Sequence, residues 1–297
     1  MCDSVDIKLI HTFRSNIKTD VNQALSDNDC MRFIIARKMD TNKAAVMASE
    51  WWEWYNTPLN AYNGATPANI FTMERFLDPH EELVGDLCPH AMHGEDKAGH
   101  PIYWEKTGFA EARMDQVKQH FDMDYLIARH IRQQTIMLIR LKHCAKKHNK
   151  DISKMVVVFD LDELRMVPDL MGLDYVRKVL LLDQAYYPER LQTIYLINAP
   201  WYFAAIYALV SAFIDPVTAK KIRILTTDFL DTLREEIDDS QIPSTLGGSG
   251  EDFVWRWPYH PSSGAAPDQL RAYLTDSEGT GNDGETRNAK TLPEDMN

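Results

Sequence analysis

Two runs of apolar residues at helical spacing lie within residues 1–60 of the chain. In the first run, Cys30, Phe33 and Ile34 share one helix face. The second run has its apolar face at Ala44, Met47, Ala48, Trp51 and Tyr55. The pattern predicts a helical hairpin, and the aromatic stripe of its second helix is expected to belong to the core of that hairpin.

From Gly99 onward, short β-rich runs alternate with longer helical runs. The predicted strands are Pro101–Glu105, Met155–Phe159, Thr193–Ile197 and Ile222–Leu225. The predicted helices are Met123–Lys147, Gly172–Leu182, Trp201–Ile214, a short turn after Pro216, and Phe229–Ile237. Strands that alternate with helices form βαβ units, so the predicted fold class is α/β with a largely parallel sheet.

Composition divides the chain into three parts. We expect a helical N-terminal lobe over residues 1–60, a βα lobe over residues 61–260 and a polar tail over residues 261–297. The glycine pair Gly247 and Gly248 lies near the end of the globular part. The tail is rich in Gly, Thr, Asp, Glu and Asn, so we expect it to be disordered.

One segment is apolar enough to raise the question of a membrane span. No Asp, Glu, Lys or Arg occurs from Leu191 to Ile214, which is long enough to cross a bilayer. Asn198 and Pro200 divide this segment into a strand-length piece and a helix that is too short to span, so no transmembrane helix is expected. The helix is apolar on every face, which leaves two interpretations. It is either a central core helix or a lid with one face over an apolar cavity and the other on a membrane.

Composition and charge exclude several classes of protein. The 297 residues are 44% hydrophobic and 26% charged, which is ordinary for a globular protein and not for a disordered, collagenous or multi-span chain. The formal net charge of −12 argues against non-specific binding of nucleic acid. The 4 cysteines form no CxxC pair, and the N-terminus has no apolar signal sequence, so we expect a reducing, cytoplasmic compartment.

A buried strand that ends in Asp-x-Asp is similar to the way haloacid-dehalogenase-type phosphatases present a nucleophile and an acid. Here the two acids are Asp160 and Asp162. The Gly-Thr pair that follows in that family is replaced by Glu163 and Leu164, and the lysine that neutralises its phosphate site is missing. A phosphatase is therefore a remote alternative, and the carboxylates are expected to cap or bridge the following loop.

Two further clusters contain candidate ligands. Cys88, His90, His93 and His100 are metal-ligand types, but their spacing matches no zinc module, and we expect them in a polar loop without a metal. The segment Arg140–Lys150 carries five positive charges at the C-terminal end of the long predicted helix. The helix dipole favours cations there, and a surface patch for anionic headgroups is the alternative.

Five short motifs, in order along the chain, resemble those of one family. They are Arg32–Asp40, Gly99–Glu105, Tyr186–Arg190 with Ile197–Pro200, Asp215–Ile222, and Ile242–Gly248. Each motif alone is weak, but their order over about Asp29–Gly248 is specific. The chain resembles the Sec14-like, or CRAL-TRIO, family of lipid-binding proteins.

The resemblance implies a helical N-terminal lobe packed on a βα lobe, with an apolar lipid pocket under a mobile gate helix. It implies the exchange of single lipid molecules and not an enzyme reaction. The gate and pocket residues would be Trp201, Phe203, Ile206, Tyr207, Val210, Phe213 and Ile214. Hinges would lie near Asn198–Pro200 and Asp215–Pro216.

The resemblance also implies a site for a lipid headgroup. Carried over from members that bind phosphatidylinositol, it nominates Arg37, Lys38, Glu189, Thr218 and Lys221. Arginine offers a fork of N–H donors, lysine a point charge and threonine a hydroxyl, while glutamate accepts from inositol hydroxyls. Arg37 and Lys38 have an alternative role as caps or ion-pair partners within the helical hairpin.

Three residues depart from the family pattern. Ile35 stands where the family has an arginine. Met155 and Val157 stand where members that also hold phosphatidylcholine carry small hydroxyl residues. These apolar residues argue against phosphatidylcholine as the second ligand and leave a sterol, another apolar lipid or a different phospholipid.

The expected function is the exchange of single phospholipids between membranes, or their presentation to lipid kinases, by a cytoplasmic protein that touches membranes transiently. The expected cargo is phosphatidylinositol. We expect a monomer with no cofactor beyond the phospholipid cargo, no metal and no nucleic-acid partner. A lipid-responsive adaptor without bulk transfer activity is the alternative.

Overall fold

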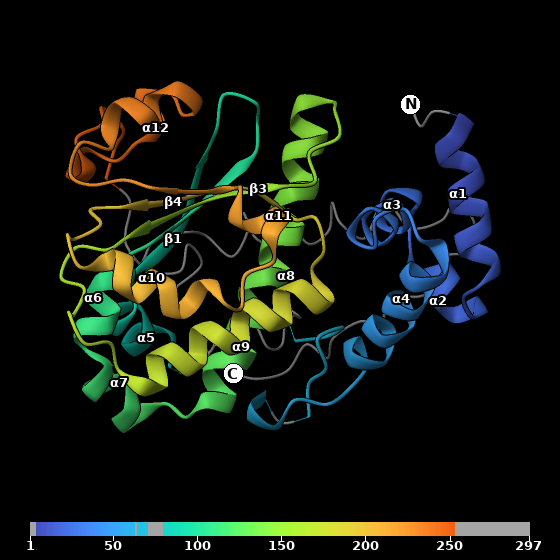
Figure 1. Ribbon diagram of the computed structural model, residues 1–297, viewed down its shortest axis with the longest axis horizontal. Coiled ribbons are helices and arrows are strands. Elements are labelled where there is room, and N and C mark those ends of the chain that lie inside the picture. Colours follow the sequence, from blue (N-terminus) through green and yellow to red (C-terminus); the bar gives the residue numbers. More distant parts are fainter. Residues whose placement is uncertain (1–3, 63, 71–79, 253–297) are drawn as a thin grey trace, which may run out of the picture.

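The structure is a computed structural model that describes residues 4–62, 64–70 and 80–252 (Figure 1). The helices of the N-terminal part lie to one side of a lobe in which helices cover a sheet. The predicted tail over residues 261–297 lies outside the described residues. The boundaries of the three predicted parts stay a prediction.

Four helices form the N-terminal lobe. They are α1 (Ser4–Ser15), α2 (Thr19–Ala24), α3 (Asp27–Ala36) and α4 (Thr41–Tyr55). Ser26 and Asp29 form a reciprocal capping box at the start of α3, and Asp40 accepts hydrogen bonds from two backbone N–H groups at the start of α4. The ring of Phe33 in α3 lies 5.9 Å from that of Trp51 in α4. The predicted hairpin and its aromatic core are confirmed.

In the described part of the chain, five strands form one sheet in the order β1-β2-β3-β4-β5. They are β1 (His90–Glu95), β2 (Pro101–Glu105), β3 (Met155–Asp160), β4 (Leu191–Ile197) and β5 (Ile222–Ile224). Strands β2 to β5 pair in parallel, as predicted, whereas β1 pairs antiparallel with β2. The prediction of a polar loop at β1 was wrong, because pairing with β2 stabilises a strand that its own side chains do not favour.

Helices connect the strands and cover the sheet. The longer ones are α5 (Glu81–Leu87), α6 (Thr107–Ala112), α7 (Met114–His120), α8 (Met123–His148), α9 (Leu170–Tyr186), α10 (Phe203–Ser211) and α12 (Leu230–Glu236). The short ones are η1 (Asn60–Tyr62), α11 (Pro216–Ala219), η3 (Asp239–Gln241) and η4 (Ser244–Leu246). Figure 1 shows α12 on one side of the sheet, and α8, α9 and α10 on the other.

Two helices differ from the prediction by more than one residue at their ends. α9 starts earlier because Asp169 caps it by accepting a hydrogen bond from Met171 N. α10 is shorter than the predicted Trp201–Ile214, since the residues at both ends form turns. None of the helices described by the structure is both long and apolar enough to cross a bilayer.

The two faces of the sheet are covered differently. On the face toward α12, the side chains of Trp104, Val156 and Tyr195 are completely buried. On the face toward α8, α9 and α10, Phe159 and Ile194 keep part of their surface accessible. Successive side chains of a strand point to opposite faces, so the difference belongs to the faces and not to separate strands. The less tightly covered face borders the candidate site.

Aromatic and charged contacts join the lobes. The rings of Trp54 in α4 and Tyr186 in α9 stack with centroids 4.1 Å apart and an interplanar angle of 2°. Arg190, just before β4, has its Nη2 atom 3.4 Å from Oδ1 of Asp29 in α3. The N-terminal lobe therefore contacts the end of α9 and the start of β4.

Candidate functional site

α10 is apolar on both its buried and its exposed face. Of the predicted gate residues, Phe203 and Ile206 are buried, Tyr207, Val210 and Ile214 are half-buried, and Trp201 and Phe213 are exposed. The buried pair packs in a cluster with Leu161 and Leu196. The interpretation of α10 as a central core helix is therefore wrong, because one of its faces is exposed. Its role as a lid stays a prediction.

A layer of partly accessible side chains lies between the sheet and these helices. Phe159 and Ile194 of the sheet and Tyr175 of α9 belong to it. Tyr175 is half-buried, and burial raises the pKa of its hydroxyl. Close-packed protein interiors contain few such surfaces. The extent of the predicted apolar pocket stays a prediction, and these residues mark where it would lie.

A polar cluster lies beside this layer, where the Tyr103 ring is 6.5 Å from that of Phe159. Tyr103 Oη donates a 2.7 Å hydrogen bond to Oε2 of Glu105, and the Gln133 amide lies 3.2 Å from the same hydroxyl. Burial, followed by the charge of Glu105, raises the pKa of Tyr103, so its hydroxyl remains a donor. The sequence analysis missed this cluster. Polar residues four positions apart on α8, Gln133 and Arg129, are the signal that points to it.

Three of the five predicted headgroup residues lie together at the starts of β4 and β5. Lys221 Nζ lies 3.7 Å from Oε2 of Glu189 and donates a 2.9 Å hydrogen bond to the Leu191 carbonyl. The backbone N–H of Lys221 donates to the carbonyl of Thr218 at 2.9 Å. The Thr218 hydroxyl in turn donates to the Asp215 carboxylate. Neighbouring parallel strands start at one edge of a sheet, which explains this proximity.

Arg37 and Lys38 lie apart from these three residues, at the C-terminal end of α3. Arg37 Nη1 donates a 3.4 Å hydrogen bond to the carbonyl of Ala36. Within the described residues, neither side chain makes an ion pair or hydrogen bond with the residues at the strand starts. Lys38 has a left-handed backbone, with φ of 54°, at the turn between α3 and α4. The structure brings together three of the five and leaves these two in the N-terminal lobe.

A charged contact between the lobes adds arginines that the sequence analysis did not nominate. Asp29 forms an ion pair with Arg32 in α3 and lies 3.4 Å from Arg190. Burial lowers the pKa of Arg32 to about 9 and that of Arg190 to about 10. Two guanidinium groups thus share the Asp29 carboxylate next to Glu189, and the carboxylate of Asp151 also acts on both of them. In the sequence, the feature that could have pointed to Arg190 is its position next to Glu189 in the same motif.

The carboxylate of Asp160 bridges two strand ends. Its Oδ1 atom accepts a 2.8 Å hydrogen bond from Asn198 Nδ2 and a 3.0 Å bond from the backbone N–H of Asp162. One oxygen of the carboxylate is therefore bound to the chain's own donors. This agrees with the expected role of a strand end that fixes the following loop.

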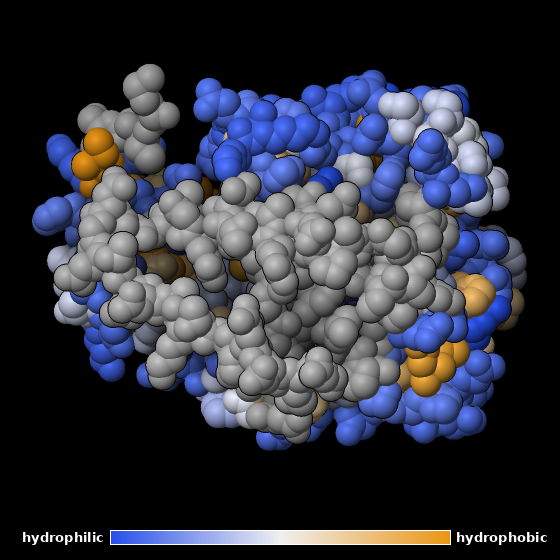
Figure 2. All heavy atoms as spheres, turned by 180° about the vertical axis from the view of Figure 1, so that it is seen from behind, coloured by the Kyte–Doolittle hydropathy of each residue, from blue (hydrophilic) through white to orange (hydrophobic). Residues whose placement is uncertain are grey.

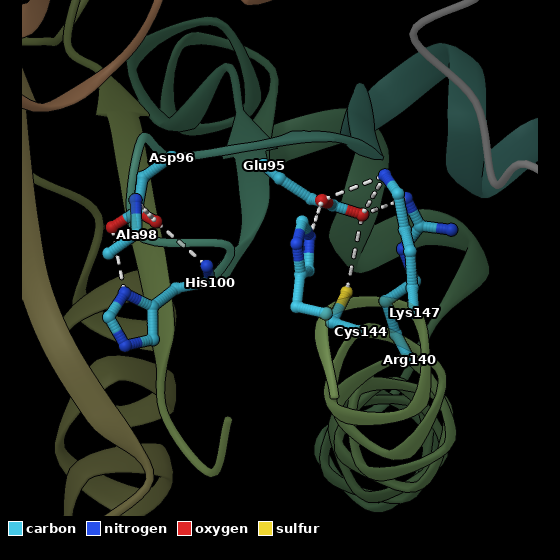
Figure 3. Close-up of polar contacts among 8 residues, drawn as sticks. Glu95, Asp96, Ala98, His100, Arg140, Cys144 and Lys147 are labelled. Carbon is cyan, nitrogen blue, oxygen red and sulfur yellow. Dashed lines mark hydrogen bonds and ion pairs between the residues drawn. The ribbon is translucent and has the colours of Figure 1, made fainter. Parts of the chain in front are cut away.

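The basic end of α8 is partly neutralised by Glu95 of β1 (Figure 3). Glu95 accepts hydrogen bonds from Lys147 at 2.9 Å and from His148 at 2.6 Å, and Arg140 lies 3.9 Å away. Burial opposes ionisation, but these bonds outweigh it and lower the pKa of Glu95 to about 2. The surface offered to anionic headgroups by this end of α8 is correspondingly reduced.

The predicted cysteine and histidine cluster has structural partners. His90 Nδ1 lies 2.8 Å from the Cys88 carbonyl, and His100 Nδ1 lies 2.8 Å from Oδ2 of Asp96 (Figure 3). Burial and the charge of Arg129 lower the pKa of His90 well below its usual value. Within residues 4–62, 64–70 and 80–252, no three potential ligands come together around one point.

A surface cavity of about 260 Å³ lies elsewhere, in the N-terminal lobe between α1 and α4. Its lining residues are Asn16, Asn42, Ala45, Val46, Ser49, Glu50 and Glu53. Small and acidic side chains offer neither the apolar area nor the cations that a phospholipid site needs. This cavity is not part of the candidate site.

Comparison with known proteins places the fold. Residues 89–248 match the family model of the CRAL/TRIO domain. The SEC14 cytosolic factor of Candida glabrata is 30% identical over 231 residues, which cover 77% of this chain and 72% of that protein. The phosphatidylinositol/phosphatidylcholine transfer protein SFH12 of Arabidopsis thaliana is 27% identical over 252 residues, or 83% of this chain and 44% of that protein.

A solved structure has the same fold. The crystal structure of Sfh5 matches with a TM-score of 0.58 at 17% identity, over 84% of this chain and 81% of that chain. The family model covers more than half of the chain, and the yeast relative aligns with most of it. The chain therefore belongs to the Sec14-like CRAL/TRIO family.

Proposed function

We propose that the chain binds a single phospholipid, phosphatidylinositol, and exchanges it between membranes or presents it to a lipid kinase. Each buried CH₂ contributes about 0.8 kcal/mol, so extraction of two acyl chains requires a pocket that replaces roughly 20 kcal/mol of hydrophobic free energy. The observation that carries the proposal is the layer of partly accessible apolar side chains under α10, including Phe159 and Ile194. The names of the relatives, which include phosphatidylinositol/phosphatidylcholine transfer proteins, support the choice of cargo.

α10 acts as the gate in this proposal. It would open against the bilayer, admit the acyl chains and close as the protein leaves. The chain changes direction on either side of it. Asn198 has a left-handed φ of 53°, and Asp215 caps the short helix that Pro216 begins. These two points are the proposed hinges.

The proposed headgroup site combines Glu189, Thr218 and Lys221 with the arginines of the lobe contact. A phosphate would accept from Lys221 Nζ, and inositol hydroxyls would donate to Glu189. Arg37 and Lys38 belong to the proposal as residues that approach the phosphate from the N-terminal lobe. Glu189 has a φ of 56°, and left-handed backbone at a non-glycine residue is often retained at binding sites.

Substitution of Lys221 tests the headgroup assignment. Loss of a hydrogen bond to a charged group costs about 1.5–3 kcal/mol, so Lys221→Gln should lower transfer of phosphatidylinositol between vesicles about tenfold. Transfer of an uncharged lipid should change much less. Lys220→Gln is the matched control, because Lys220 is exposed and adjacent. Equal losses for both lipids would reject the assignment.

Mass spectrometry of lipid extracted from the purified protein tests the cargo itself. The expected result is one equivalent of phosphatidylinositol. Copurified lipid without exchange between vesicles would favour the adaptor function over transfer. Absence of any bound lipid, together with no transfer, would contradict the proposal.

A further inference from the structure

The C-terminal end of α8 carries a group of exposed lysines. Lys142 and Lys146 are four residues apart, so they lie on one face of the helix, and both are exposed. Lys150 is exposed just beyond the helix, where its backbone N–H donates a 3.2 Å hydrogen bond to the Ala145 carbonyl and keeps it beside the last turn. We name Lys142, Lys146 and Lys150 the lysine patch.

The acids near this end of α8 do not neutralise the lysine patch. Glu95 accepts hydrogen bonds from Lys147 and His148 (Figure 3). Asp151 follows the patch directly, but its charge acts on the two arginines of the lobe contact. Within residues 4–62, 64–70 and 80–252, no ion pair includes Lys142 or Lys150. The helix dipole adds a partial charge of only about −0.5 here, so the patch stays positive.

A short run of acids lies beyond the last described residue. Residues 272–286 contain Asp276, Glu278, Asp283 and Glu285, and no lysine or arginine. We name residues 276–285 the acidic segment. The formal charge of the whole chain is −12, so the molecule as a whole repels this segment, whereas the lysine patch attracts it. The two are therefore complementary in charge.

The described chain ends close to the basic end of α8. Asp252 accepts a 2.9 Å hydrogen bond from a backbone N–H of η4, which follows η3 directly in the chain. In η3, the side chain of Gln241 approaches β1 so closely that a Cβ at Gly94 would lie 2.9 Å from its Oε1 atom. The next residue of β1, Glu95, lies 2.9 Å from Lys147 Nζ. Strand β1 thus contacts both the exit of the chain and the end of α8.

The figures show the same arrangement. In Figure 1, the turn between β1 and β2 lies at the top of the molecule, between α12 and the upper end of α8. Figure 2 shows that this upper edge is mostly hydrophilic when it is seen from behind. The charge of Arg140 in α8 and that of Glu251 near the exit both act on His93 of β1, with opposite effects on its pKa. A short path therefore joins the exit of the chain to the lysine patch.

The chain is long enough for the acidic segment to reach the lysine patch. The 24 residues from Asp252 to Asp276 span at most about 80 Å when fully extended. The whole of α8, with 26 residues, is only about 39 Å long. A tether within one chain gives effective concentrations of about millimolar, so a weak contact is enough to keep the two surfaces together.

We propose that the acidic segment, residues 276–285, docks on the lysine patch of its own chain. Its carboxylates form exposed ion pairs with Lys142, Lys146 and Lys150, and such pairs form and break readily. The contact covers a positive surface that would otherwise attract anionic membranes. The proposal goes beyond the proposed lipid exchange and does not depend on it.

Carbodiimide cross-linking of the full chain tests the contact directly, because this reagent joins a lysine amine to a carboxylate that touches it. Mass spectrometry of the monomer should find links between the lysine patch and the acidic segment. Their yield should fall at least about threefold when the salt concentration is raised from about 0.1 M to about 0.5 M, since salt screens exposed charges. Lys8 and Lys18, exposed lysines of the N-terminal lobe, are the internal controls.

Two cross-linking results would overturn the proposal. If the acidic segment is linked to Lys8 or Lys18 as often as to the lysine patch, or to neither, the patch is not its docking site. If the links occur only between two chains, the occupant of the patch is a second copy and not the same chain.

Flotation with vesicles that contain phosphatidylserine tests whether the contact masks the lysine patch. Replacement of the four acids of the acidic segment by their amides should raise the partition coefficient about tenfold, because each lysine near an anionic surface adds to the affinity. Further replacement of Lys142→Gln with Lys150→Gln should abolish this gain. The matched control, Lys8→Gln with Lys18→Gln, should leave it unchanged.

The control pair separates masking from net charge. A gain that persists without Lys142 and Lys150 would come from the altered net charge alone and would overturn the masking of the patch. Normal lipid exchange in all of these variants would leave the proposed function standing whatever the outcome here. Circular dichroism of each variant checks that the fold is intact.

Discussion

Gly108, in α6, lies too close to a neighbouring backbone to be replaced. A methyl group at this position would lie 2.0 Å from the Asp162 carbonyl oxygen and 2.6 Å from the Leu161 carbonyl carbon. Overpacking against backbone costs about 1–3 kcal/mol, so Gly108→Ala should lower the free energy of unfolding by about that amount. Urea denaturation measures it.

Gly172, in α9, is the control. A methyl group at this position would lie 2.5 Å from Oε2 of Glu111, which is a side-chain atom and not backbone. Alanine is favoured over glycine in a helix by about 1 kcal/mol, so Gly172→Ala should change stability by less than Gly108→Ala. A larger loss at Gly172 would show that the loop after β3 is free to move away from α6.

Several site residues were predictable only by resemblance. Glu189 and Lys221 are separated widely in sequence, and only the parallel pairing of β4 with β5 places them 3.7 Å apart. Arg190 lacks any pattern that reveals its contact with Asp29. Ordinary polar residues at strand starts have no periodicity, so local sequence cannot indicate which of them meet.

The elements with strong periodicity were predicted well. β2 has the predicted bounds, and α8 begins at the predicted residue, Met123. β1 was missed because its sequence, His90–Glu95, contains two histidines and a glycine at positions where an apolar alternation would be expected. An edge strand obtains its stability from the partner strand, which a local pattern does not contain.

The contact between β1 and α8 should depend on pH. Glu95 has a pKa lowered to about 2 from an ordinary value of 4.5. Its stabilising effect is therefore complete above about pH 4.5 and is lost as the pH falls toward 2. Glu95→Gln should destabilise the fold by about 1 kcal/mol near pH 7, after allowance for solvent screening, and by progressively less below pH 4.5.

Asp231 provides the control for this prediction. It forms an ion pair with Arg234 at 3.4 Å, but its side chain is almost fully exposed. Asp231→Asn should leave the free energy of unfolding nearly unchanged, because exposed pairs contribute little. Equal effects of the two substitutions, measured by denaturation at several pH values, would show that the cluster at Glu95 is only a surface pair.

At the scale of the whole molecule, the stacked rings of Trp54 and Tyr186 hold the two lobes together. An aromatic pair contributes about 0.5–1.5 kcal/mol beyond its buried area. Trp54→Ala should therefore increase hydrogen exchange at the end of α9, where Tyr186 lies. Trp52→Ala is the control, because the Trp52 indole donates to Asp20 within the N-terminal lobe. Equal hydrogen exchange at the end of α9 in both variants would show that the stacked rings of Trp54 and Tyr186 do not hold α9 in place.

The outer face of α10 is built largely from alanine, with Ala204, Ala205, Ala208 and Ala212 all exposed. A methyl group adds little area, so these alanines contribute little when the face is buried against another surface. In the proposed gate, these small side chains leave few contacts to break when α10 opens. Larger aliphatic residues at these positions would expose more apolar area. The expected consequences are slower opening of the proposed gate and aggregation of the protein.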